Sequence, residues 1–204
     1  MKSPPPPKLT ALRRARPGTI LLEVDGEPWR AVPDEVVVRC GLGAGVELDR
    51  PLLRQLRREL RRAEALDLAG RALRRRDLSL RRLSERLERA GVAPAAERSA
   101  LLALSEARIV DDARLADGRA ATLAEHGWGN VAIAARLEAE GIPEADAGSA
   151  IAKLEPETAR AARAAAAVSD PRKVWALLTR RGFDEEAIEA VVETLDEKTG
   201  GGLG

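Results

Sequence analysis

The sequence predicts a mainly α-helical protein: a tandem array of three three-helix repeats, preceded by a small N-terminal β-hairpin plus helix segment. Two observations support this prediction. One spacing frame recurs three times in the chain, centred on Gly91, Gly141 and Gly182. Around each of these glycines the apolar residues keep the three- and four-residue spacing of an amphipathic helix. A frame that returns at intervals of 40 to 50 residues is the mark of a repeat architecture.

The frame places apolar residues eight and four positions before each glycine, directly after it, and 10 and 13 positions after it. Residues four apart lie on one face of a helix, so each copy contains two helices joined at the glycine. Glycine ends a helix because it adopts the left-handed conformation cheaply. The matched residues are Leu83, Leu87, Val92, Leu101 and Leu104 in the first copy, Ile133, Leu137, Ile142, Ile151 and Leu154 in the second, and Val174, Leu178, Phe183, Val192 and Leu195 in the third.

Helix starts are expected at Ser79, Gly129 and Asp170, four residues before the first apolar position of each copy. Serine and aspartate accept hydrogen bonds from the first-turn N–H groups of a helix. A further helix is expected upstream in each repeat, over residues 66–73, 115–123 and 159–168. The repeats then span residues 63–110, 111–157 and 158–196. One such unit is too small for a substantial core of its own, so we expect the units to stack.

The N-terminal region is expected to be a small β segment. Residues 1–10 are rich in proline and predict a disordered arm. Two strand-like runs, 19–24 and 27–32, flank Asp25-Gly26, which is a hairpin signal, and Pro28 favours an edge strand for the second run. A short helix follows from Pro33-Asp34, although Val36–Val38 fits a strand equally well. Another helix begins near Asp49.

Residues 11–62 therefore form the N-terminal segment, and the Gly-rich tail, residues 197–204, is expected to be disordered. The chain has 204 residues and one cysteine, which excludes an intrachain disulfide. No apolar run is long enough to span a membrane. The start of the chain lacks the apolar core of a signal peptide. These features predict a cytoplasmic protein, and we expect a monomer.

The charge is divided along the chain although the formal net charge is only +1. Residues 1–110 contain 23 Lys and Arg against 15 Asp and Glu, a balance of +8, whereas residues 111–204 contain 11 against 18, a balance of −7. Such a division suggests a charged partner, either nucleic acid or a nucleoprotein surface.

Arginines are densest between residues 57 and 89, and several share helix faces. Two interpretations remain open. They form a solvated face paired with neighbouring glutamates, or they form a strip that contacts phosphates and binds in a salt-dependent manner. The candidate contact residues are Arg57, Arg58, Arg61, Arg62, Arg71, Arg74, Arg75, Arg76, Arg81, Arg82, Arg86 and Arg89.

Catalytic and cofactor chemistry has no support in the sequence. With one histidine, His126, and one thiol, Cys40, a Cys/His zinc site cannot be built. Asp111 and Asp112 are best explained as residues of a helix start. The loop Gly41–Gly45 lacks a nucleotide-binding fingerprint. Aromatic residues make up 2%, which argues against a base-stacking module. The sequence predicts no catalytic, cofactor or metal site, and no enzyme.

Several segments resemble the RecX family of regulatory proteins. The likeness runs from about residue 9 to residue 195. Its most distinctive segments are Ile109-Val110-Asp111-Asp112-Ala113-Arg114-Leu115-Ala116 and Leu177-Leu178-Thr179-Arg180-Arg181-Gly182-Phe183-Asp184. The sequence departs from the family at Leu115, where an aromatic residue is usual. It also departs at Val131 and Ala132, where basic residues often stand.

The resemblance implies a non-enzymatic modulator of the RecA recombinase. Such proteins bind the RecA filament on single-stranded DNA and restrain its recombinase, ATPase and co-protease activities, which belong to DNA repair, homologous recombination and the SOS response. The expected partners are RecA and its nucleoprotein filament, single-stranded DNA and, as a further candidate, duplex DNA. One alternative is a helix-turn-helix DNA-binding regulator that acts without RecA. Another is a helical scaffold for an unrelated partner.

Overall fold

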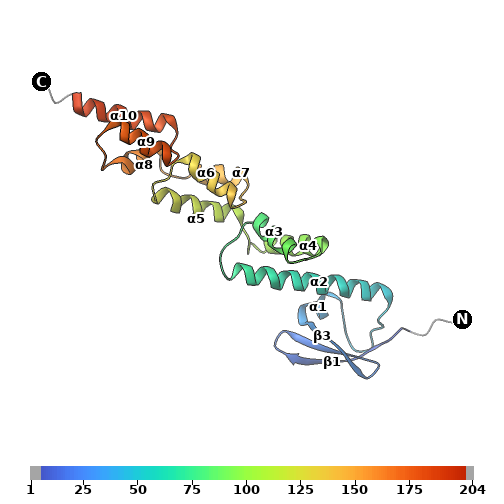
Figure 1. Ribbon diagram of the computed structural model, residues 1–204. Coiled ribbons are helices and arrows are strands. Elements are labelled where there is room, and N and C mark those ends of the chain that lie inside the picture. The colour runs from blue at the N-terminus through green and yellow to red at the C-terminus, as the bar shows by residue number, and fades with distance from the viewer. Residues whose placement is uncertain (1–5, 201–204) are drawn as a thin grey trace. The chain divides into compact units, whose positions relative to one another are not determined.

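The computed structural model describes residues 6–200, which form ten helices and a three-stranded sheet (Figure 1). The mainly helical architecture with three three-helix repeats after a small β segment is confirmed. Among these residues the chain divides into two compact units. The first runs to Arg76 and includes Leu83–Glu106, and the second contains Asp77–Arg82 and the chain from Ala107 onward.

The N-terminal β element is a sheet rather than a hairpin. The strands β1 (Leu9–Arg16), β2 (Thr19–Val24) and β3 (Glu27–Pro33) pair antiparallel in that order, so Pro28 lies on an edge strand as predicted. The predicted arm is wrong at Leu9 and Thr10, which belong to β1. The sequence did not predict β1 because half of this strand is polar and its residues do not alternate regularly.

Leu9 shows why the chain is ordered there. Its side chain is fully buried, its N–H donates to the carbonyl of Val46 at 2.8 Å, and its own carbonyl accepts from Gly45 N at 2.7 Å. The Gly41–Gly45 loop, which lacks a nucleotide-binding fingerprint, is therefore hydrogen-bonded to the first strand. Residues 1–5 of the predicted arm lie outside the described residues.

Two helices, α1 (Asp34–Arg39) and α2 (Arg50–Leu73), cover the sheet, and α1 lies between the sheet and α2 (Figure 1). The ambiguous run Val36–Val38 is helical, with Val36 buried and Val38 exposed. The first turn of α2 is capped by Asp49, whose side chain accepts from Leu52 N at 2.8 Å. The core beneath contains Leu9, Leu22, Val32, Val36, Leu56 and Leu60.

The boundary predicted between residues 62 and 63 is absent, because α2 is one continuous helix of 24 residues. Its buried residues Leu56, Leu60, Ala65 and Ala69 keep helical spacing across that boundary. Neither proline nor glycine interrupts the chain there, so nothing stops the helix. The end of α2 thus serves as the first helix of the first repeat.

The other helices follow the repeat frame. The first repeat continues with α3 (Leu80–Arg89) and α4 (Pro94–Glu106). The second comprises α5 (Asp112–Glu125), α6 (Asn130–Ala139) and α7 (Glu144–Ala152). The third comprises α8 (Glu157–Ala165), α9 (Pro171–Arg180) and α10 (Glu185–Gly200), so α10 extends beyond the predicted end at residue 196. The rest of the predicted tail, residues 201–204, lies outside the described residues.

The glycine stops have the predicted geometry in all three repeats. The φ angles of Gly91, Gly141 and Gly182 are +77°, +79° and +70°. In each case the N–H of the next residue reaches the carbonyl five positions back: Val92 to Leu87 at 3.1 Å, Ile142 to Leu137 at 3.0 Å, and Phe183 to Leu178 at 3.1 Å. This is the Schellman pattern, which satisfies carbonyls that a helix end would otherwise leave unpaired.

Within the second unit, the start of α6 abuts the end of α9. Gly129 N donates to Arg181 O at 2.9 Å, and Val131 N donates to Gly182 O at 3.1 Å. A Cβ atom on Gly129 would lie 2.2 Å from Gly182 O, so no other residue fits without a backbone shift. The start of α3 meets the end of α6 similarly, since Ser79 Oγ donates to Glu140 O at 2.7 Å.

A buried or partly buried carboxyl group accompanies each of these junctions. Asp112, the first residue of α5, accepts from Leu80 N at 2.9 Å. Glu157, the first residue of α8, accepts from Asn130 N at 2.6 Å. Leu80 and Asn130 stand at the same position of the frame, 11 residues before the glycine. Burial raises the pKa of both carboxyl groups.

Candidate nucleic-acid interface

The solvent face of α2 carries a row of exposed arginines, which we call the α2 strip. They follow helical spacing opposite the buried Leu56 and Leu60. The sequence analysis named only the last three and missed the first two, although the same three- and four-residue spacing includes them. The strip consists of Arg50, Arg54, Arg57, Arg58 and Arg61.

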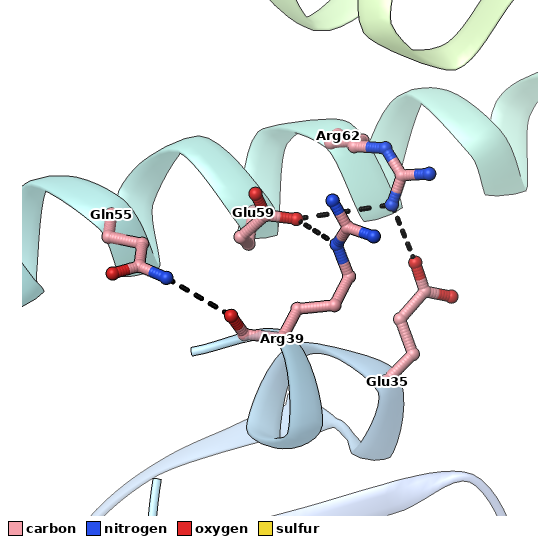
Figure 2. A network of polar contacts seen from close by, with 5 residues as sticks. All are labelled: Glu35, Arg39, Gln55, Glu59 and Arg62. Carbon is pink, nitrogen blue, oxygen red and sulfur yellow. Dashed lines mark hydrogen bonds and ion pairs between the residues drawn. The ribbon is translucent and has the colours of Figure 1, made fainter. Parts of the chain in front are cut away.

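Arg62, by contrast, points toward α1 and belongs to a polar network (Figure 2). Only 14% of its side chain is exposed, and its guanidinium lies 3.0 Å from Glu35 and 3.9 Å from Glu59. Glu59 also accepts from Arg39 Nε at 2.5 Å, and this hydrogen bond raises the pKa of Arg39. Gln55 Nε2 donates to the carbonyl of Arg39 at 3.0 Å.

The network holds α1 against α2 and so turns the α2 strip toward solvent. Arg62 is engaged in this structural role, and we leave it out of the contact surface proposed below. Glu59, which the sequence analysis considered as a partner for neighbouring arginines of a solvated face, pairs with Arg39 of another helix as well as with Arg62. This pairing could not be predicted from the sequence, because Arg39 and Glu59 stand 20 residues apart.

The arginines at the end of α2 form a second group. Arg71 pairs with Asp67 one turn earlier at 2.7 Å, as on a solvated helix face. Arg74, Arg75 and Arg76 follow in the turn after the helix and are exposed. Cationic side chains are favoured there by the partial negative charge of a helix C-terminus. Among the described residues these three arginines make no ion pair.

The predicted arginines of α3 divide between the two units, Arg81 and Arg82 in the second and Arg86 and Arg89 in the first. Leu83 and Leu87 bury the opposite face of this helix. Arg82 donates to the carbonyl of Ala139, at the end of α6, and Arg89 Nε donates to Glu85 O at 3.0 Å. The twelve predicted residues therefore belong to two separate structural units.

Repeat 2 contains a basic cluster that the sequence analysis did not predict. The guanidinium carbon of Arg136 lies 3.7 Å from the centroid of the Trp128 ring. Arg119 Nε pairs with Glu140 at 3.1 Å. The net negative charge of this half of the chain gave no indication of a basic cluster. The sequence offers no helical spacing that would signal the contact, because Trp128 lies in the turn before α6 and Arg136 lies within that helix.

The remaining polar candidates have structural roles. Asp111 caps α5 as predicted, since its Oδ1 accepts from Arg114 N at 2.9 Å. Asp112 was interpreted as part of the same helix start, but its side chain bonds the distant Leu80 N–H instead. Cys40 is buried, which raises the pKa of its thiol and keeps it in the unreactive protonated form.

Among residues 6–200, no three His, Cys, Asp or Glu side chains gather as the ligands of a metal ion would. None of the helices in this range combines the length and apolar character needed to cross a membrane.

Comparison with solved structures identifies the fold. A crystal structure of the regulatory protein RecX superposes with a TM-score of 0.80 at 20% identity, covering 92% of this chain and 99% of that one. RecX from Lactobacillus salivarius gives a TM-score of 0.61 at 16% identity, covering 67% of this chain and 97% of that one. No protein-family model and no curated protein sequence matches the chain. The chain has the fold of the RecX structures.

Proposed function

We propose that this protein is a RecX-type regulator, a non-enzymatic protein that binds RecA filaments on single-stranded DNA and inhibits them. The observation that carries the proposal is the likeness in fold to RecX over nearly the whole chain. The two segments around Asp111 and Gly182 support it independently, because they resemble the family at the level of sequence.

The α2 strip is the proposed contact with DNA phosphates. From Arg50 to Arg61 it spans about 16 Å along the helix axis at 1.5 Å per residue. Each arginine that neutralises a phosphate releases counterions, so binding weakens as salt is added. If all five arginines engage a single strand, log K should fall with log salt with a slope of roughly −3.5.

In this proposal the protein inhibits by occupying the RecA filament and not by catalysing a reaction. A protein that binds RecA in its DNA-bound form competes with the strand that would be exchanged and with the substrates of co-protease cleavage. It also restrains the conformational steps that accompany ATP hydrolysis. We place this action in the cytoplasm, in the control of homologous recombination and the SOS response.

The direct test is the ATPase of RecA on single-stranded DNA, followed while the purified protein is added. We expect dose-dependent suppression at substoichiometric or equimolar ratios to RecA. No suppression, together with tight and sequence-selective binding to duplex DNA, would instead favour a helix-turn-helix regulator that acts without RecA.

A matched pair of variants tests the role of the strip. Arg57 lies in the α2 strip, whereas Arg98 is exposed on α4 of the same unit. We expect Arg57→Glu to weaken suppression and to make its salt dependence shallower, because a phosphate contact becomes a repulsion. Arg98→Glu changes the net charge equally and should behave like the wild type. Equal losses in both variants would contradict a role specific to the strip.

A further inference from the structure

A small open cavity lies in repeat 2, between α5 and α6. Its volume is about 320 Å³, at the lower end of the range of roughly 300–1,000 Å³ found for small-ligand sites. It is lined by Arg119, Thr122, Leu123, Arg136, Ala139 and Glu140. Two guanidinium groups therefore flank a concave surface in the half of the chain that is acidic overall.

Arg136 is fixed in place by an aromatic platform. Its guanidinium lies over the ring of Trp128, an arrangement that attracts a cation to the face of the ring. Trp128 itself is held at both backbone groups, since its N–H donates to Leu123 O at 3.1 Å and its carbonyl accepts from Arg160 Nη1 at 3.0 Å. An arginine held in this way loses little conformational freedom when it binds an anion.

Arg119 is engaged through one nitrogen, Nε, which pairs with Glu140. Both side chains of the pair are 43% exposed, and exposed pairs of this kind are weak. The planar fork of an arginine offers further donors, so Arg119 can bind an anion while it keeps its carboxylate partner. Arg82, which donates to Ala139 O, brings a third guanidinium to the end of α6.

We infer that Arg119 and Arg136 form a second binding site for single-stranded DNA, in which they hold a backbone phosphate while a base stacks on the Arg136 guanidinium. The charge supports this ligand, because the cavity is lined by two guanidinium groups, those of Arg119 and Arg136, and by one carboxylate, Glu140. The stacked plane supports a single strand over a duplex, since only unpaired bases present their faces to a protein. The choice of DNA as the ligand rests on the proposed function.

The test measures binding of a fluorescent single-stranded oligonucleotide by anisotropy, without RecA, over a range of salt. We expect Arg136→Gln and Arg119→Gln each to weaken binding roughly fivefold near 0.1 M salt and to make the salt slope shallower by about 0.7. Arg114→Gln is the matched control, because Arg114 is exposed on the same helix α5 and does not line the cavity. Circular dichroism melting confirms that each variant is folded.

Arg136→Lys separates stacking from charge. Lysine keeps the positive charge but has no planar group to lie on Trp128 or under a base. We expect it to restore the salt slope while the affinity stays below that of the wild type. Full recovery of affinity by lysine would overturn the stacked geometry, and binding of duplex DNA with equal dependence on Arg136 would overturn the choice of a single strand.

The two proposals fail in different ways. Unchanged oligonucleotide binding in both glutamine variants, or no binding by the wild type, overturns the repeat 2 site whatever the RecA assay gives. If the wild type leaves RecA hydrolysis unaffected and Arg136→Gln still loses affinity for the oligonucleotide, the proposed regulation of RecA is wrong and the repeat 2 site stands.

Discussion

Gly118 and Gly129 lie in the same repeat and differ completely in their surroundings. A Cβ atom on Gly118 would meet nothing within 4 Å, whereas on Gly129 it would overlap the backbone of Gly182 and Phe183. The φ angle of Gly129 is −82°, which any residue adopts. Its requirement for glycine is therefore one of space, set by a helix from the next repeat, and not of backbone conformation.

We predict that Gly129→Ala destabilises the protein by about 1–3 kcal/mol, because the added methyl group forces the two helix ends apart. Gly118→Ala, in the interior of α5, should stabilise it by roughly 0.5–1 kcal/mol, because alanine is the better helix former. Urea denaturation followed by circular dichroism measures both. Similar effects of the two substitutions would show that the close approach at Gly129 is absent in solution.

At the same junction, the ionisation state of Glu157 affects the stability of the fold. Its Oε1 accepts from Asn130 N and, at 3.4 Å, from Asp184 N, while its buried Oε2 has no hydrogen-bond donor among the described residues. Burial is the main reason that the pKa of Glu157 is raised, and the carboxyl group of Asp184 raises it further. Arg160, nearby on α8, donates hydrogen bonds to Glu155 O, Trp128 O and Asn130 Oδ1.

The sign of the pH effect follows from that raised pKa. A carboxyl group whose pKa is higher in the folded state stabilises the fold fully below its unfolded value of about 4.3 and loses this contribution as pH rises through the folded value. We predict that Glu157→Gln removes this loss, so the variant gains stability relative to the wild type as pH rises above the unfolded value of about 4.3. Urea denaturation at a series of pH values is the measurement.

Glu155→Gln is the control of opposite sign. Hydrogen bonds from Arg163 lower the pKa of Glu155, so its contribution is present at neutral pH and lost as pH falls. This variant should therefore lose stability relative to the wild type at neutral pH, and the difference should vanish in acid. Parallel pH profiles for Glu157→Gln and the wild type would contradict the assignment at the junction.

At the scale of elements, α2 combines three tasks in one helix. It covers the sheet through Leu56 and Leu60, fixes α1 through Glu59 and Arg62, and presents the α2 strip to solvent. Neighbouring arginines on such a helix face in different directions, about 100° apart. Arg61 and Arg62 are adjacent in sequence, yet Arg61 is exposed and Arg62 is partly buried.

We predict that these neighbours differ in function. Arg61→Gln should lower affinity for single-stranded DNA and make the salt slope shallower by about 0.7, as loss of one phosphate contact requires. Arg62→Gln should leave the slope unchanged and instead lower the free energy of unfolding by roughly 1 kcal/mol, because Glu35 and Glu59 lose a charged partner. An equal change of slope in both variants would argue against the assignment of Arg62 to the network.

The helices and strands also differ in how well the sequence predicts them. Helix ends at Gly91, Gly141 and Gly182 were predictable because glycine imposes its stop locally. The strand β1 was not, because its residues show no regular alternation, and it is held by pairing with β2 and, at Leu9, by bonds to Val46 and Gly45, which are remote in sequence. The same holds for the interface. Exposed arginines on α2 follow from spacing, whereas Arg62 and the cluster at Arg136 depend on partners that only the fold brings together.

At the scale of the whole molecule, the repeats are similar in frame and different in charge and in junction. The start of α3 meets the end of α6 through the side chains of Ser79 and Arg82, while the start of α6 meets the end of α9 through backbone hydrogen bonds. The start of α9 is capped by its own N-cap residue, since Asp170 accepts from Arg172 N at 2.9 Å.

The junction at Gly129 has a consequence for amide hydrogen exchange. The first four N–H groups of a helix normally lack partners and exchange fast. In α6 all four are bonded to the third repeat: Gly129 to Arg181 O, Asn130 to Glu157, and Val131 and Ala132 to Gly182 O. We predict that these amides exchange as slowly as those in the middle of α6, whereas the amide of Lys173 at the start of α9 exchanges fast. Hydrogen exchange followed by mass spectrometry or NMR measures these rates. Fast exchange at Gly129–Ala132 would mean that the second and third repeats open independently.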